Sequence, residues 1–123
     1  MSYKFSLDFQ KHILASIITD DKFLQENSDV IKPEYFGDEI LAGLCSTALD
    51  FFKKHKEAPA KSAIHKEIKS SLAPGRRLHE YLDELEEVYK LVGINTPYYH
   101  EQATQFARSQ AVQGAVRAAI PLI

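Results

Sequence analysis

Few residues of this chain could perform catalysis or bind a metal. There is one cysteine, and the five histidines are His12, His55, His65, His79 and His100. Cys45 lies on the apolar face of a helical pattern, which predicts a buried and unreactive thiol. The stretch from His79 to Asp83 resembles the zinc motif H-E-x-x-H, but an aspartate replaces the second histidine. We therefore expect no catalytic residue and no metal site.

The chain also lacks the sequence motifs that bind and hydrolyse nucleotides. A phosphate-binding loop needs the pattern G-x-x-x-x-G-K-[ST], in which backbone amides surround the phosphates. No G-x-S-x-G motif places a serine nucleophile either. The glycines are too scattered to form these loops: Gly37, Gly43, Gly75, Gly93 and Gly114. The sequence predicts that this chain alone hydrolyses no ATP and needs no cofactor.

Positive charge is concentrated in one stretch of the sequence. Residues 53–77 hold eight Lys or Arg against two Glu, although the whole chain carries a net charge of -2. A candidate basic patch consists of Lys53, Lys54, Lys56, Lys61, Arg76 and Arg77. Two interpretations stay open, a solvated helix face and non-specific contact with a nucleic-acid backbone. The window has no aromatic residue that could stack on a base.

Apolar residues recur at helical spacing along the whole chain, and strand alternation is almost absent. The spacing predicts a compact all-α bundle of five to six helices. Ser6, Asp20 and Asp38 precede three of these helices and are expected to cap them. Pro33 and Pro59 mark interruptions. The last helix is expected to start at Pro97, with Thr96 as its cap, and to run toward Pro121.

The last helix carries a stripe of small side chains, formed by Ala103, Ala107, Ala111, Gly114 and Ala118. Such a stripe allows another helix to approach closely. The partner is either a helix of the same domain or, for part of the stripe, another subunit. A glycine inside a helix costs about 1 kcal/mol relative to alanine. Gly114 therefore indicates a packing reason, and Gly114→Leu is expected to crowd the contact.

Composition is typical of one globular domain. The chain has 123 residues, 45% of them hydrophobic and 26% charged. A single cysteine excludes an internal disulfide and favours a reducing compartment. Neither a signal peptide nor a membrane-spanning apolar run is present in these residues. We expect a cytoplasmic protein. The apolar run that ends at Ile123 indicates a fragment of a longer protein.

Three segments carry a resemblance to a known family. The first is residues 13–20, an apolar helix closed by an acidic residue. The second is residues 31–36, an aromatic turn followed by a long helix that ends at Pro59. The third is Tyr81-Leu82 together with residues 95–97, which lead into residues 106–111. In the order of these segments the chain resembles the N-terminal domain of DnaB-like replicative helicases, particularly the phage branch with the T4-type helicase.

The resemblance implies an organisation and a role. Residues 1–96 would form a globular helical head, and residues 97–123 the first arm of a helical hairpin that is cut short. The family's ATPase domain, which would bind ATP and magnesium, is absent. Its N-terminal domains form a collar on a hexameric ring around single-stranded DNA. They pair with one another and dock primase and helicase loaders.

Two other functions stay open beside this non-catalytic docking role. The chain could be a free-standing helical adaptor or inhibitor that binds replication proteins, or a small nucleic-acid-binding helical protein. The first alternative predicts a stop codon after Ile123, whereas a helicase domain predicts that the coding sequence continues. The second predicts salt-sensitive DNA binding through residues 53–77.

Overall fold

The structure, a computed structural model, describes residues 5–71 and 76–119, without the side chains of residue 76 and residues 116–119. Within these ranges the chain forms six α-helices and one 3-10 turn, and no strand. They are α1 (Leu7–Ile18), α2 (Asp21–Asn27), η1 (Pro33–Tyr35), α3 (Glu39–His55), α4 (Lys61–Ser71), α5 (Arg76–Lys90) and α6 (Thr96–Ala119). The all-α bundle predicted from the periodicity is confirmed.

Three helices begin at the caps that the sequence predicts. In each case a side-chain oxygen accepts a hydrogen bond from the backbone N–H three residues later. The bonds join Phe9 to Ser6 at 3.1 Å, Phe23 to Asp20 at 2.8 Å and Leu41 to Asp38 at 3.0 Å. A cap of this kind stabilises a helix by about 1 kcal/mol, because it satisfies a donor that has no partner inside the helix.

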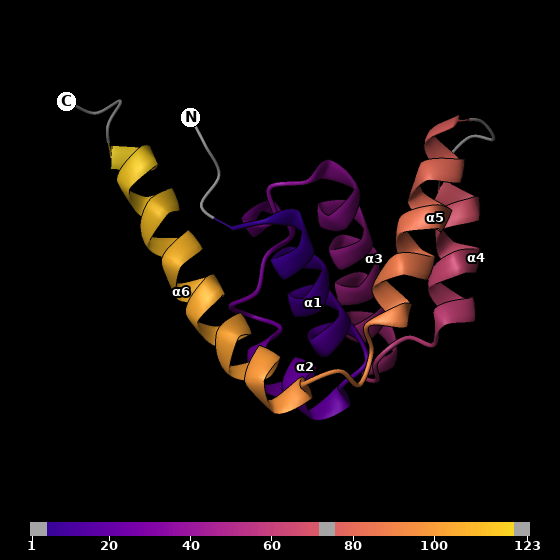
Figure 1. The fold of residues 1–123 in the computed structure, drawn as a ribbon, viewed down its shortest axis with the longest axis horizontal. Coiled ribbons are helices and arrows are strands. Elements are labelled where there is room, and N and C mark those ends of the chain that lie inside the picture. Colours follow the sequence, from indigo (N-terminus) through magenta and orange to yellow (C-terminus); the bar gives the residue numbers. More distant parts are fainter. Residues whose placement is uncertain (1–4, 72–75, 120–123) are drawn as a thin grey trace.

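Helix α1 is the centre of the bundle. It contacts α2, α3, α5 and α6, and the side chains of Ile13, Leu14, Ile17 and Ile18 are at most 1% exposed. Figure 1 shows α1 and α3 in the middle, the α4–α5 pair on one side and α6 on the other. Because one helix touches four others, substitutions in α1 are expected to affect the whole fold.

A buried amide fixes the N-terminal segment to the start of α3. Gln10 is 3% exposed although its side chain is polar. Its Nε2 donates to the carbonyl oxygen of Phe5 at 3.0 Å, and its Oε1 accepts from the backbone N–H of Gly37 at 2.8 Å. Both ends of the amide are therefore satisfied, as burial of a polar group requires.

Helix α3 contacts α5 at a glycine. A Cβ atom built on Gly43 would lie 2.7 Å from Cε2 and 2.9 Å from the hydroxyl oxygen of Tyr81. Real Cβ atoms do not come this near to other heavy atoms, so the ring occupies the space that a larger residue would need. A larger residue at position 43 would therefore have to displace the ring of Tyr81, whereas the backbone conformation of Gly43 does not itself demand glycine.

This contact predicts a coupling between the two residues. We expect Gly43→Ala to be about 1 to 2 kcal/mol more favourable in a Tyr81→Ala background than in the natural chain. The reason is that alanine is the better helix former but must displace the ring when Tyr81 is present. A double-mutant cycle in urea measures the coupling. Equal effects of Gly43→Ala in both backgrounds would contradict the contact.

The connection between α5 and α6 ends one residue earlier than the sequence predicts. Gly93 lies in this connection with φ +86, a conformation that glycine adopts readily. Helix α6 begins at Thr96 and not at Pro97. The cap position falls on Asn95, whose carbonyl oxygen accepts from the N–H of Tyr99 at 3.0 Å. Asn95 takes a φ of 48, which asparagine tolerates better than threonine does.

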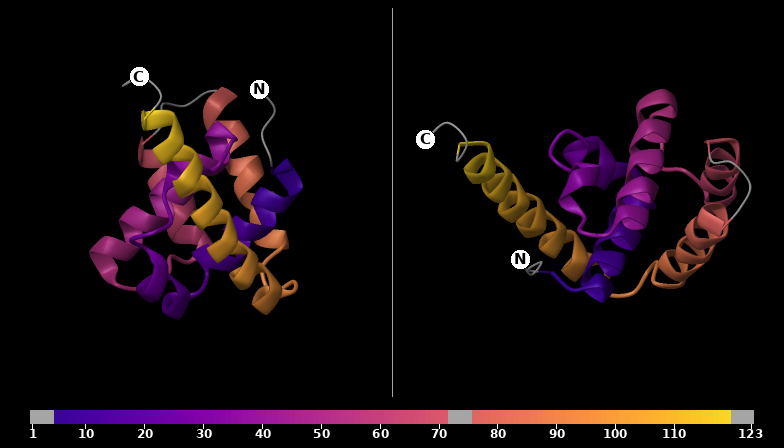
Figure 2. Two further views of the ribbon diagram at one scale, coloured as in Figure 1. Left: turned by 90° about the vertical axis from the view of Figure 1, so that its left-hand side faces the viewer. Right: turned by 90° about the horizontal axis from the view of Figure 1, so that it is seen from above.

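The boundary expected between residues 96 and 97 does not divide the packing. Ala103, Phe106 and Ala107 of α6 are at most 5% exposed and belong to the same core as α1 and α3. The second part of α6 is different, since residues 111–115 are all exposed. Seen from above, α6 leaves the other helices along its length (Figure 2). The first half of α6 thus packs in the same core as α1 and α3, and the division into a head and a hairpin arm stays a prediction.

Candidate functional site

The thiol of Cys45 lies inside the core, as predicted. Its side chain is 1% exposed, and burial raises the pKa of the thiol from 9.0 to about 12. A thiol with this pKa is fully protonated near neutral pH, and the thiolate is the form that attacks substrates or binds metals. Cys45 is therefore a core residue without nucleophilic character.

The stretch from His79 to Asp83 at the start of α5 is exposed at its histidine and aspartate. His79 is exposed, and Tyr81 and Leu82 pack against the core. Among the residues that the structure describes, no group of three His, Cys, Asp or Glu side chains is placed to hold a metal ion. The near match to a zinc motif is thus explained by an ordinary amphipathic helix.

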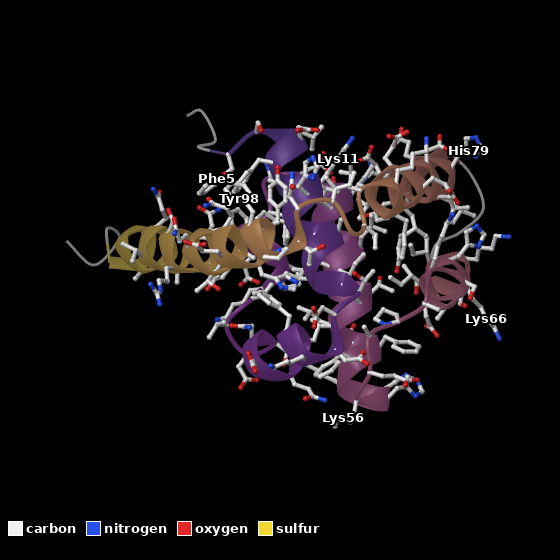
Figure 3. The ribbon with its side chains drawn as sticks, turned by 60° about the horizontal axis from the view of Figure 1, so that its bottom comes forward. Phe5, Lys11, Lys56, Lys66, His79 and Tyr98 are labelled. Atoms are coloured by element: carbon white, nitrogen blue, oxygen red, sulfur yellow. The ribbon has the colours of Figure 1, made fainter. Side chains whose placement is uncertain are left out.

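The six residues of the candidate basic patch do not come together. Lys53, Lys54 and Lys56 are exposed at the C-terminal end of α3. Arg77 lies at the opposite end of that helix, where it forms an ion pair with Glu39 at 2.8 Å. The two groups are separated by roughly 20 Å, the rise of fourteen helical residues. In Figure 3, Lys56 and His79, which follows Arg77 closely, are likewise far apart.

The other two members of that set are explained differently. Lys61 is used within the fold, because its ammonium group lies 2.6 Å from a carboxylate oxygen of Glu86. This hydrogen bond lowers the pKa of the Glu86 carboxyl group. The side chain of Arg76 lies outside the described residues. Of the six predicted residues, Lys53, Lys54 and Lys56 at the end of α3 remain as a compact cationic group. Cations at the C-terminal end of a helix are also stabilised by the helix dipole.

The stripe of small residues on α6 is divided between two environments. Ala103 and Ala107 are 0% and 5% exposed, packed in the core of their own domain. Ala111 and Gly114 are exposed, and a Cβ on Gly114 would meet no atom within 4 Å. The side chain of Ala118 lies outside the described residues. The first half of the stripe thus has an internal partner, and the exposed positions have none within the described part of the chain.

Two polar contacts fix the first half of α6 to the head. The carbonyl oxygen of Ser16, at the end of α1, lies 2.7 Å from Nε2 of His100. Because a carbonyl oxygen can only accept, Nε2 is the donor. Further along the helix, the buried side chain of Gln110 donates to the carbonyl oxygen of Tyr35 at 2.6 Å. Beyond Gln110, residues 111–115 of the helix are all exposed.

A groove runs along the flank of α6 between these two contacts. One depression of about 460 Å³ lies between α2 and the first turns of α6, and a second of about 430 Å³ lies between residues 27–35 and the middle of α6. Asn27 and Thr104 line both depressions, so the two lie next to each other along α6, and together they are called the groove below. Figure 3 shows this side of the molecule, with α6 above α2, and Phe5 and Tyr98 on the opposite flank of α6.

The groove has an acidic end and an apolar end. Glu26 and Glu101 line the first depression, and both are exposed. The second depression is lined by Val30, which is 53% exposed, together with Ala107 and Ala111. An apolar surface beside exposed charge is suited to protein contacts.

Sequence reasoning missed this groove for a physical reason. Its two walls are about seventy residues apart in the chain, and each of its side chains fits an ordinary helix or loop pattern. The one local signal is Val30, an apolar residue between the polar end of α2 and Pro33 that a solvated loop does not need.

Comparison of the chain with protein-family models, with curated proteins and with solved structures finds no match. Among the described residues, no helix is both long and apolar enough to cross a membrane.

Proposed function

We propose that this chain is the N-terminal collar and docking domain of a DnaB-like, phage-type replicative helicase. In this role it takes part in DNA replication in the cytoplasm. It associates with other copies of the chain in a ring, and it binds primase or a helicase loader. It performs no catalysis itself and meets single-stranded DNA only indirectly. ATP, magnesium and unwinding belong to an ATPase domain outside these residues.

The observation that carries the proposal is the exposed segment 111–115 of α6. Helix α6 has 24 residues, and this segment includes Val112, which is 64% exposed. Exposed apolar side chains on a helix that extends past its own core favour a contact with another helix. In a helicase collar that contact would come from the second arm of the hairpin and from neighbouring subunits.

The coding sequence around these residues tests the proposal directly. We expect it to continue past Ile123 into a second helical arm and then a domain with the G-x-x-x-x-G-K-[ST] loop. A stop codon directly after Ile123 would contradict the helicase assignment. The chain would then be the free-standing adaptor or inhibitor, and its partners would be identified by affinity capture with purified replication proteins.

Gly114 provides a test of self-association. Because nothing lies within 4 Å of a Cβ at this position, Gly114→Ala is expected to stabilise the monomer by up to about 1 kcal/mol through helix propensity. The sequence left open whether the close contact at Gly114 lies within the fold or between subunits, and among the described residues Gly114 has no neighbour in its own fold. Gly114→Leu should instead weaken association between copies about tenfold, because it overpacks a close helix contact.

Sedimentation equilibrium measures the association of these variants, and urea unfolding measures their stability. Gln113→Leu is the matched control, since the neighbouring side chain is exposed on the same turn. It should leave association nearly unchanged. If Gly114→Leu and Gln113→Leu give the natural distribution of mass, the exposed part of the stripe forms no contact between copies.

Nucleic-acid binding remains a second candidate for one specific reason. Lys53, Lys54 and Lys56 are exposed, and no ion pair with them is present in the described residues. The test is binding of single-stranded DNA at increasing salt, with the three lysines changed to glutamate. Unchanged binding in the triple variant would exclude this cluster as a nucleic-acid site.

A further inference from the structure

The groove along α6 is as long as a short helix. It extends along α6 from His100 to Ala111, which is roughly 16 Å or three helical turns. One wall is α6 and the other is α2 with the loop that follows it. A groove of this kind between two helical elements is a common acceptor of an amphipathic helix, whose apolar face enters while its polar face stays in water.

The charges at the first end of the groove lack partners. Glu26 and Glu101 form no ion pair with any residue that the structure describes, and both carboxylates are exposed. Asp20, also on this wall, caps α2 and lies 3.6 Å from His100. Lys22 contributes the opposite charge nearby. The excess of carboxylates disfavours phosphate groups and favours basic residues at this end.

The second end of the groove lacks an apolar partner. Val30 is 53% exposed and faces the same depression as the small side chains of Ala107 and Ala111. The small side chains of Ala107 and Ala111 leave an open space on this side of α6, and Val30 borders that space. Lys32 and Arg108 border this end with Asp29. An apolar side chain of a partner would fill this space about two helical turns from the carboxylates.

We propose that the groove binds an amphipathic helix of a partner protein, with basic residues over Glu26 and Glu101 and an apolar residue over Val30, Ala107 and Ala111. The inference rests on the docking role proposed above and specifies the chemistry of the partner. The binding energy comes mainly from burying the apolar end, whereas the charges select the partner and its direction in the groove.

A synthetic peptide tests the inference with the chain as it stands. The probe is a blocked helical peptide of about 14 residues with two arginines in its first turn and leucines two turns later. Its addition to the isotope-labelled chain is followed by the shifts of backbone amide resonances. We expect saturable shifts confined to residues 20–35 and 100–111. A peptide with glutamates in place of the arginines should bind about tenfold more weakly.

Variants of the groove separate specific binding from general attraction. Glu26→Lys with Glu101→Lys should weaken the arginine peptide about tenfold and strengthen the glutamate peptide. Val30→Asp should weaken the binding of the arginine peptide and of the glutamate peptide. The control is Glu67→Lys with Asp83→Lys, which makes the same change in net charge at exposed positions on α4 and α5. The control should bind the arginine peptide within about twofold of the natural chain.

Several outcomes would overturn the inference. They are no saturable binding of the arginine peptide, shifts centred outside the groove, and equal weakening in the control variant. Shifts at the groove that arise when the chain alone is concentrated would assign the groove to a second copy. The readout uses only this chain and a peptide. A stop codon after Ile123 would therefore refute the helicase proposal without changing the peptide result.

Discussion

Replacing Leu14 with alanine is expected to lower the free energy of unfolding by about 3 to 5 kcal/mol, the largest effect of any single substitution proposed for this chain. Leu14 is 0% exposed and lies in α1, the helix that contacts four others. Removing its side chain loses the transfer free energy of the buried carbons and leaves a cavity between rigid helices. A domain of this size is stable by only about 5 to 15 kcal/mol, so the variant should be close to unfolding.

Urea unfolding followed by far-ultraviolet circular dichroism measures the change. The matched control is Leu7→Ala, the same substitution in the same helix at a side chain that is 45% exposed. Its cost should stay below about 1 kcal/mol, because little apolar surface returns to water. Similar losses in the two variants would mean that α1 is not the centre of the core.

Raising the pH from about 9 to about 11 is expected to destabilise the fold by roughly 2 to 3 kcal/mol through Cys45 alone. Burial raises the pKa of this thiol from 9.0 to about 12. Between the two values the unfolded chain loses the proton while the folded chain keeps it. Stability from the neutral thiol is therefore fully present below pH 9 and is lost as the pH rises toward 12.

A second buried acid acts in the same direction. Burial raises the pKa of Tyr89 from 10.0 to about 12, and its hydroxyl donates to the carbonyl oxygen of Pro59 at 3.3 Å. Stability should therefore fall further between pH 10 and 12. The variants Cys45→Ala and Tyr89→Phe, compared in urea at each pH, separate the two contributions. If the free energy of unfolding falls equally steeply with pH in Cys45→Ala and in the natural chain, Cys45 is not the source of the alkaline destabilisation.

A reactive thiol would also contradict the buried state of Cys45. The side chain should resist a small disulfide reagent in the folded chain near neutral pH and react fully after unfolding in urea. This measurement uses the same protein and separates burial from any global effect of alkali on lysine and tyrosine side chains.

The helices of this protein were predictable from local sequence because local physics forms them. Ser6, Asp20 and Asp38 cap their helices through contacts three residues away. The apolar spacing likewise predicted the buried faces of α1 and α3, including that of Cys45. The absence of a phosphate-binding loop is a property of the sequence alone. These features need no knowledge of how distant segments meet.

The candidate sites depended on tertiary structure. Arg77 and Lys53 are close in a plot of charge along the chain, yet α3 separates them by its own length. Ala103 and Gly114 belong to one helical stripe, but only the first half of α6 reaches α1 and η1. Periodicity describes which residues share a face of one helix. It contains no information about how far along that face a neighbouring helix extends.

The groove illustrates the same limit most clearly. Glu26 and Glu101 are ordinary solvated acids in the sequence, and they line one depression because α2 and the start of α6 both lie at the end of α1. The ring of Phe23 stacks on that of His100, and His100 in turn bonds to Ser16 at the end of α1. The sequence alone thus determined the helices and the lack of catalytic motifs. The tertiary structure decided which surfaces are left without a partner, because burial depends on contacts between residues far apart in the chain.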